Sequence, residues 1–246
     1  MAIDETLLGR AEGEAESWLR LYQWEPHCLS FGRHEPASRH YDAGRIAALG
    51  LDTVRRPTGG RAVWHGRELT YAVAAPSDRF GSLRAAYLEI HRMLADALRL
   101  LGAEVSLAPR VRTPPLRAGA CFAQPSGGEL MVNGRKVVGS AQYRGGAALL
   151  QHGSILLEDD QGTVLRLSRD ATDEGPLHDP DQSLAAPLAT LLGRSVRCSE
   201  VAAAIARTAA SRWSGNWRPI SDPASILRDA SSRYRRYRSP SWTWAR

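Results

Sequence analysis

The segment that decides the fold is ELMVNGRKVVGSAQYRGGAALLQHGSILLE, residues 129–158. Asn133-Gly134 separates the strand-forming runs ELMV and RKVVGSAQ, and this dipeptide is typical of a type I′ β-hairpin turn. A further apolar run, residues 148–158, follows after a short link that contains two glycines. The segment therefore predicts three consecutive strands that are neighbours in one sheet.

The rest of the chain divides into a strand-rich part and a helical part. Aromatic and apolar patterning predicts strands at 18–24, 28–32, 53–56 and 62–75. Helical periodicity predicts helices at 1–11, 39–49, 82–101, 183–193 and 199–213, with Ser82 and Ser199 as N-caps. These elements indicate an α+β fold around a mixed or antiparallel sheet. We expect one domain over residues 1–246, helical from about residue 160 and without a separate accessory domain.

Composition narrows the function classes. The 246 residues contain no apolar run of membrane-spanning length and no signal-peptide layout, so we expect a cytoplasmic protein. A net charge of +6 and a pI of about 9.6 suit an acidic partner, which charge alone cannot identify as nucleic acid, membrane or carrier protein. No spacing of His, Asp or Glu suggests a metal site.

The three cysteines, Cys28, Cys121 and Cys198, form an odd set without a close pair. This argues against a disulfide framework and against a cysteine-based zinc site. A buried cysteine is usually a small inert apolar residue, which is our interpretation of Cys28 and Cys198. Cys121 ends the Pro- and Arg-rich loop 109–120 and is the candidate nucleophile.

The segment RRPTGGRAVWH, residues 55–65, predicts a ligand-binding turn between two strands. Gly59 and Gly60 allow positive φ and a close approach of the backbone, and N–H groups in such a turn bind anions or an oxyanion. A bare glycine pair is more often an ordinary tight turn. Arg56 and the other arginines that flank this pair, with His65 after it, favour a site.

Lysine occurs once in the chain. All but one of the 32 basic residues are arginine, and the exception is Lys136, just after the hairpin turn. A compact ammonium makes different contacts from a planar guanidinium. It can bond a substrate carbonyl and stabilise a neighbouring thiolate. Lys136 is therefore a candidate catalytic residue, although a single lysine can also survive an arginine bias by chance.

Four segments together resemble the family that contains octanoyltransferases, lipoate-protein ligases and biotin-protein ligases. They are RRPTGGRAVWHGRELTY (55–71), CFAQPSGGEL (121–130), GRKVVGSAQYR (134–144) and LLQHGSILL (149–157). The match is closest to LipM-type octanoyltransferases, and the N-terminal MAIDETLL and the tail RYRSPSWTW extend it over nearly the whole chain. The glycine loop is not of the GRGR type, which disfavours biotin. Members usually begin with an extra strand before the MAIDETLL helix, so we expect either a shortened gene sequence or a missing edge strand here.

The resemblance implies a class II synthetase-like sheet with packed helices and an acyltransferase of lipoate biosynthesis that needs no cofactor. Cys121 would take the octanoyl group from octanoyl-acyl carrier protein as a thioester, with Lys136 facing the thioester carbonyl. The acceptor would be a lysine of a lipoyl-carrier protein, either the glycine cleavage H protein or a lipoyl domain. The residues expected to bind the acyl group are Arg56, Gly59, Gly60, His65, Gly139 and Ser140. His152 is either a general base or a satisfied core histidine, and His65 is equally ambiguous.

Three alternatives remain open. An ATP-dependent lipoate-protein ligase would use Lys136 to bind lipoyl-adenylate and would need no thiol. A transferase could instead move octanoyl between two lipoyl-carrier proteins. A silent module that only holds a lipoyl domain is disfavoured, because Cys121, Lys136 and both glycine segments are present together. The basic tail RYRRYR suits an acidic acyl carrier better than nucleic acid, and we expect no nucleic-acid or membrane partner.

Overall fold

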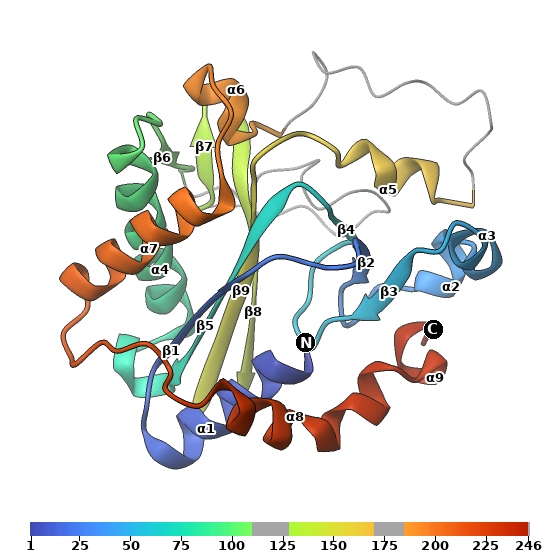
Figure 1. Cartoon of the computed structure of the whole chain (residues 1–246), viewed down its shortest axis with the longest axis horizontal. Helices are drawn as coiled ribbons and strands as arrows, with labels where there is room; N and C mark the ends of the chain where they lie inside the picture. The colour runs from blue at the N-terminus through green and yellow to red at the C-terminus, as the bar shows by residue number, and fades with distance from the viewer. Residues whose placement is uncertain (110–127, 170–184, 246) are drawn as a thin grey trace.

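The computed structural model describes residues 1–109, 128–169 and 185–245, in which two sheets are surrounded by helices (Figure 1). The larger sheet has the order β1-β5-β9-β8-β7-β6, and every neighbouring pair is antiparallel. Its strands are β1 (Trp18–Tyr22), β5 (Glu68–Pro76), β6 (Ser106–Leu107), β7 (Leu130–Val132), β8 (Arg135–Gly145) and β9 (Ala148–Leu156). The smaller sheet has the order β3-β2-β4, with strands β2 (Cys28–Phe31), β3 (Asp52–Arg55) and β4 (Val63–His65).

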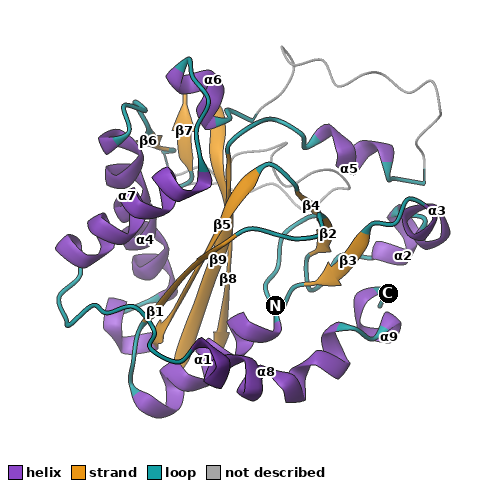
Figure 2. Cartoon of the chain, viewed as in Figure 1, coloured by secondary structure: helices purple, strands orange, loops and turns teal. Residues whose placement is uncertain are grey.

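The helices cover both sheets (Figure 2). They are α1 (Ala2–Glu14), α2 (Ala37–His40), α3 (Ala43–Ala48), the 3-10 helix η1 (Ser77–Phe80), α4 (Leu83–Leu100), α5 (Gly162–Arg166), α6 (Leu188–Leu192), α7 (Cys198–Arg212), α8 (Pro223–Tyr237) and α9 (Pro240–Thr243). Helices α4 and α7 pack on one face of this sheet, and α1 and α8 pack on the other. No helix in the described part of the chain is long and apolar enough to cross a membrane. The α+β prediction is confirmed.

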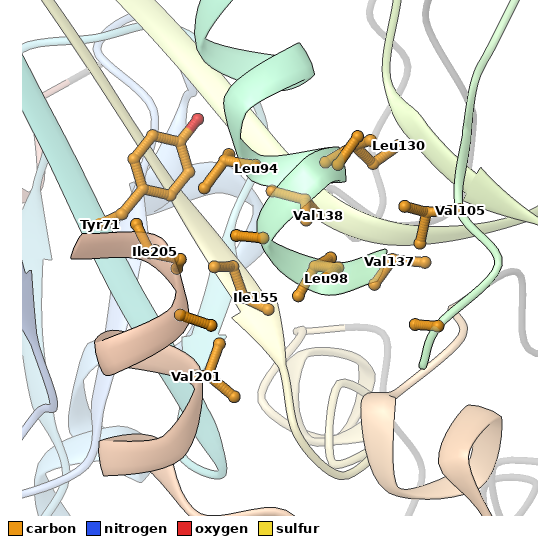
Figure 3. Packing of buried hydrophobic residues seen from close by; sticks show 14 of the residues in the cluster. Tyr71, Leu94, Leu98, Val105, Leu130, Val137, Val138, Ile155, Val201 and Ile205 are labelled. Atoms are coloured by element: carbon orange, nitrogen blue, oxygen red, sulfur yellow. The ribbon is translucent and has the colours of Figure 1, made fainter. Parts of the chain in front are cut away.

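The side chains of β5 alternate between the two faces, which produces two apolar clusters. Leu69, Tyr71 and Val73 join the cluster under α4 and α7, whereas Ala72 and Ala74 join the cluster under α1. Figure 3 shows the first cluster, where Leu98, Ile155 and Val201 come from α4, β9 and α7. Burying one such aliphatic side chain contributes about 1.5–3 kcal/mol, so this cluster is the main support of the larger sheet.

The three consecutive strands predicted from residues 129–158 are β7, β8 and β9. Asn133 and Gly134 have φ values of 49° and 75°, as a type I′ turn requires. β8 and β9 approach closely at Gly153, where a Cβ would lie 2.3 Å from the carbonyl oxygen of Gly139. A glycine is therefore required at the point where these strands meet.

Two predictions about helices in the first 101 residues have different outcomes. Ser82 is the N-cap of α4, and its side chain accepts a hydrogen bond from Ala85 N, as predicted. The predicted helix 39–49 is wrong in extent, because Tyr41 is extended and separates α2 from α3. Asp42 then caps α3 by accepting from Arg45 N at 3.0 Å, so a side-chain cap starts a new helix where periodicity predicted continuity.

The helices near the C-terminus also differ from prediction. The prediction of Ser199 as N-cap is wrong, since α7 begins at Cys198 after Arg197, which makes no side-chain cap. Helix α6 begins only at Leu188, because the preceding residues pair with β8: Ala186 N donates to the carbonyl of Lys136 at 2.8 Å. The basic tail forms the last turns of α8, which was not predicted.

Arg55 attaches the end of the chain to the smaller sheet. Its side chain is only 1% exposed, and its guanidinium donates to carbonyl oxygens of two separate segments. These oxygens belong to Gly32, Arg33, Glu35, Trp242, Thr243 and Ala245. Arg55 is thus a buried structural residue, although it stands next to a predicted site residue in the sequence.

Candidate functional site

One pocket is lined by residues of both sheets. The residues around it are Met1, Arg56, Val63, His65, Thr70, Gly139, Ser140, Ala141, His152, Gly153 and Ser154. Five of the predicted binding residues, Arg56, His65, Gly139, Ser140 and His152, are among them. Segments from strands β4, β5, β8 and β9 therefore meet at one place, which the sequence order alone does not reveal.

The smaller sheet contributes His65 in a fully hydrogen-bonded setting. Its Nδ1 lies 2.6 Å from Oε1 of Glu68, and its Nε2 lies 2.5 Å from Oγ of Ser30. The Arg56 guanidinium, which can only donate, lies 2.6 Å from the same Ser30 Oγ. Ser30 Oγ therefore accepts from Arg56, and its own proton can be donated to Nε2 of His65. One face of the ring stacks on Trp24, with centroids 4.4 Å apart.

Arg56 also holds the glycine loop. It donates through Nη1 to the Ser30 carbonyl at 2.9 Å, and through Nη2 to the carbonyls of Gly59 and Arg61 at 3.2 and 2.7 Å. Gly60 has a φ of 94°, and a Cβ there would lie 4.0 Å from the Cβ of Ala141 in the pocket wall. Gly59 and Gly60 do not line the pocket directly, so the loop acts as its support.

The larger sheet contributes His152, which is also satisfied at both nitrogens. Nε2 lies 2.6 Å from Oγ1 of Thr58, and Nδ1 lies 3.3 Å from Oδ2 of Asp4. Burial lowers the pKa of His152 and keeps the ring neutral. Asp4 also accepts from Arg20 at 2.7 Å and from the Tyr22 hydroxyl at 3.2 Å.

Asp4 remains a carboxylate although it is fully buried. Burial raises its pKa, but the positive charges of the Met1 amino group and Arg20, together with the hydrogen bond from His152, hold the pKa well below its usual range. The ionised carboxylate accepts the Nδ1 proton of His152, which leaves Nε2 to accept from Thr58. His152 therefore connects α1 to the glycine loop.

Lys136 lies outside this pocket lining. Its side chain is 2% exposed, and its ammonium lies 2.6 Å from Oε1 of Glu129, which is 3% exposed. Sequence reasoning did not identify Glu129. A charged residue at the start of the apolar run ELMV, across the hairpin from the single lysine, was the signal that could have found it.

The predicted nucleophile Cys121 lies outside the described residues. Burial raises the pKa of Cys28 to about 12 and also raises that of Cys198, so both are neutral thiols near pH 7. Sequence reasoning also missed Asp4, Ser30 and Glu68. Only Glu68 had a local signal, since it follows His65 by three residues.

Comparison with known proteins finds relatives that match nearly the whole chain. An octanoyltransferase LipM of Exiguobacterium sibiricum is 36% identical over the whole chain and 94% of its own length, and one of Kyrpidia tusciae is 35% identical over 99% of the chain and 93% of its length. The fold matches a T. acidophilum protein solved with bound lipoic acid, with a TM-score of 0.80, 18% identity and coverage of 100% of this chain and 92% of that one. It also matches lipoate-protein ligase A bound with ATP, with a TM-score of 0.79, 19% identity and coverage of 99% and 92%.

A family match gives the strongest assignment. Residues 1–210 match the family described as the lipoyl protein ligase A/B catalytic domain, and this range contains every residue of the pocket. The predicted resemblance is therefore confirmed, together with the fold that it implies. The chain belongs to the lipoyl protein ligase A/B catalytic-domain family.

Proposed function

We propose that this chain is an octanoyltransferase of lipoate biosynthesis. In this reaction an octanoyl group passes from octanoyl-acyl carrier protein to Cys121, and then to a lysine of a lipoyl-carrier protein. The full-length curated relatives, which are named octanoyltransferases LipM, support this assignment. The acceptor is a lipoyl-carrier protein, and we assign the glycine cleavage H protein or a lipoyl domain to that role.

The observation that carries the proposal is the way the pocket satisfies its own polar groups. Both nitrogens of His65 and of His152 bond to buried protein groups, and Arg56 donates to the glycine loop. An alkyl chain offers no hydrogen bonds, so a ligand of this kind would leave buried polar groups unpaired unless they were already paired. A pocket whose polar side chains bond back into the protein suits an acyl chain.

The proposed reaction uses the thiol of Cys121 and the ammonium of Lys136. The Cys121 thiolate attacks the carbonyl carbon of the octanoyl thioester, and the carrier thiolate leaves and takes a proton. The lysine amine of the acceptor then attacks the acyl-enzyme, the C–N bond forms, and the Cys121 sulfur leaves. The surplus proton of the amine returns to that sulfur. Lys136 stabilises the thiolate and the oxyanion, and Glu129 holds the Lys136 side chain through their 2.6 Å contact.

The arginines of the tail RYRRYR are the proposed contact surface for the acyl carrier protein that donates the octanoyl group. Arg235 on α8 and Arg238, directly after it, are exposed, whereas Arg233 and Arg236 lie 3.8 and 3.0 Å from the carboxylate of Glu5. Two of the four tail arginines therefore remain available to an acidic acyl carrier. Electrostatic complementarity of this kind mainly increases the rate of encounter.

The test is an intact mass spectrum after mixing the chain with octanoyl-acyl carrier protein without ATP. We expect a mass increase of one octanoyl group that hydroxylamine removes and that Cys121→Ala abolishes. The Cys28→Ala variant is the matched control and should still be acylated. A folded chain that forms no adduct, but lipoylates a carrier once ATP and lipoate are present, would instead be a ligase.

A further inference from the structure

A chain of buried hydrogen bonds crosses the larger sheet and ends at His91 of α4. Nε2 of Gln151 lies 2.9 Å from the Tyr71 hydroxyl, which lies 2.7 Å from Oγ of Ser140. Ser140 Oγ lies 2.8 Å from Nε2 of His91, and Nδ1 of His91 lies 2.6 Å from the carbonyl oxygen of Gly128. His91 is 0% exposed and takes no part in the site described above.

The hydrogen bonds of this series all run in one direction from donor to acceptor, and the acceptor at the end of the series determines that direction. The Gly128 carbonyl can only accept, so Nδ1 of His91 carries the proton. Nε2 then accepts from the Ser140 hydroxyl, and Ser140 in turn accepts from Tyr71. Burial lowers the pKa of His91 to about 4, so the imidazole is neutral at physiological pH and supplies one donor and one acceptor.

The two ends of His91 reach two different parts of the proposed machinery. Ser140 lines the pocket, while Gly128 directly precedes Glu129, the partner of Lys136. Gly128 is closely packed, because a Cβ there would lie 2.9 Å from Cδ2 of Leu88. The charge of Lys136 is near enough to contribute to the low pKa of His91, after the larger effect of burial.

We propose that His91 is a positioning residue for acyl transfer, which acts through the Gly128 carbonyl to hold Glu129 and thereby Lys136 in place. Further backbone bonds hold the described part of this segment: Gly128 N donates to the Ala108 carbonyl at 2.9 Å, and Ala108 N donates to the Glu129 carbonyl at 2.7 Å. The His91 bond holds the Gly128 carbonyl from the side of α4. This inference rests on the proposed function, since it assigns Lys136 to the same reaction.

Two matched variants separate the two ends of His91. In His91→Asn the amide lies where Nδ1 lies, so it can still donate to Gly128 but cannot reach Ser140. In His91→Gln the amide lies near the position of Nε2, so it keeps the hydrogen bond to Ser140 and loses the hydrogen bond to Gly128. Both variants remove the imidazole and introduce a neutral amide, so differences between them report which bond matters.

The measurement is steady-state octanoyl transfer, with kcat and KM for the octanoyl carrier determined separately. We expect His91→Gln to lower kcat by roughly ten- to a hundred-fold with little change in KM, because Lys136 is misplaced rather than removed. His91→Asn should keep kcat within about threefold of the unmodified chain. Thermal melting of both variants is measured in parallel.

Each outcome decides the proposal. Equal losses of kcat in the two variants, with equal falls in melting temperature, would make His91 a structural core residue and overturn the inference. An unchanged kcat in both variants would overturn it as well. If the unmodified chain transfers no octanoyl group, the proposed function fails and the inference falls with it, whereas an active chain with two identical variants removes the inference alone.

Discussion

The two walls of the pocket place an imidazole in the same local arrangement. His65 on the smaller-sheet side and His152 on the larger-sheet side each lie between a buried carboxylate and a hydroxyl. The carboxylates differ in their other partners. Asp4 also accepts from Arg20 and Tyr22, whereas Glu68 bonds only to His65 and Thr70 among the described residues, and its Oε2 has no partner there.

This difference shows that two similar arrangements of carboxylate, imidazole and hydroxyl can contribute unequally to stability. Asp4 would keep an arginine if its histidine were lost. Glu68 is 1% exposed and would keep only the Thr70 hydroxyl, at 2.5 Å. A buried carboxylate without a strong partner is costly, so the smaller-sheet wall depends on its imidazole more than the larger-sheet wall does.

The largest expected effect tests this asymmetry directly. His65→Ala should lower the free energy of unfolding by about 3–5 kcal/mol, because it leaves the Glu68 carboxylate nearly unpaired. His152→Ala should cost about 1–3 kcal/mol, because Asp4 retains Arg20. Urea denaturation of both variants gives the two values.

A double variant serves as the control for that comparison. Adding Glu68→Gln to His65→Ala removes the buried charge and should restore part of the lost stability. Adding Asp4→Asn to His152→Ala should restore none, because it breaks the contact with Arg20. Equal costs for the two single variants, or no recovery with Glu68→Gln, would contradict the asymmetry.

Acid should lower the free energy of unfolding through the buried histidines His91 and His152. Burial lowers the pKa of His91 to about 4, and an unfolded histidine titrates near 6.5. The unfolded chain therefore takes up this proton first, so the contribution of His91 is complete above pH 6.5 and is lost as the pH falls towards 4. The loss is on the order of 3 kcal/mol over that interval, and His152 adds to it in the same direction.

The check is the free energy of unfolding measured between pH 7 and pH 4. His91→Gln should flatten this dependence, since glutamine does not titrate. Asp4 acts in a lower window, because its depressed pKa makes its contribution complete above the ordinary pKa of an unfolded aspartate, about 4, and that contribution is lost progressively as the pH falls below this value. A slope that is the same with and without His91 would show that other groups govern the acid response.

The smallest expected effect separates the two glycines of the loop. Gly60 has a φ of 94°, so Gly60→Ala should cost about 1–2 kcal/mol. A Cβ at Gly59 would meet nothing within 4 Å, so Gly59→Ala should stay within about 0.5 kcal/mol of the unmodified chain. Melting temperatures of the two variants decide this, and an equal fall in both would contradict the assignment of the strained position to Gly60.

Local patterns were sufficient for the elements that depend on near neighbours. The hairpin turn at Asn133-Gly134 and the cap at Ser82 follow from backbone geometry and short-range hydrogen bonds, which a sequence records directly. The break at Tyr41 was missed, because periodicity does not register the competing cap at Asp42. Five predicted binding residues proved to share one pocket, since each belongs to a motif that was readable by itself.

The sequence by itself determined the α+β class, the hairpin, the long helix α4 and the family, because each is expressed in contiguous residues. Only the tertiary structure decided what the two adjacent arginines contact: Arg55 turns to the C-terminal segment and Arg56 to the pocket. The tertiary structure also determined that Asp4, Glu129 and His91 are bonding partners of predicted site residues. Their contacts join residues that are far apart in the chain or on different elements, and burial sets their charge states, so no local pattern contains them.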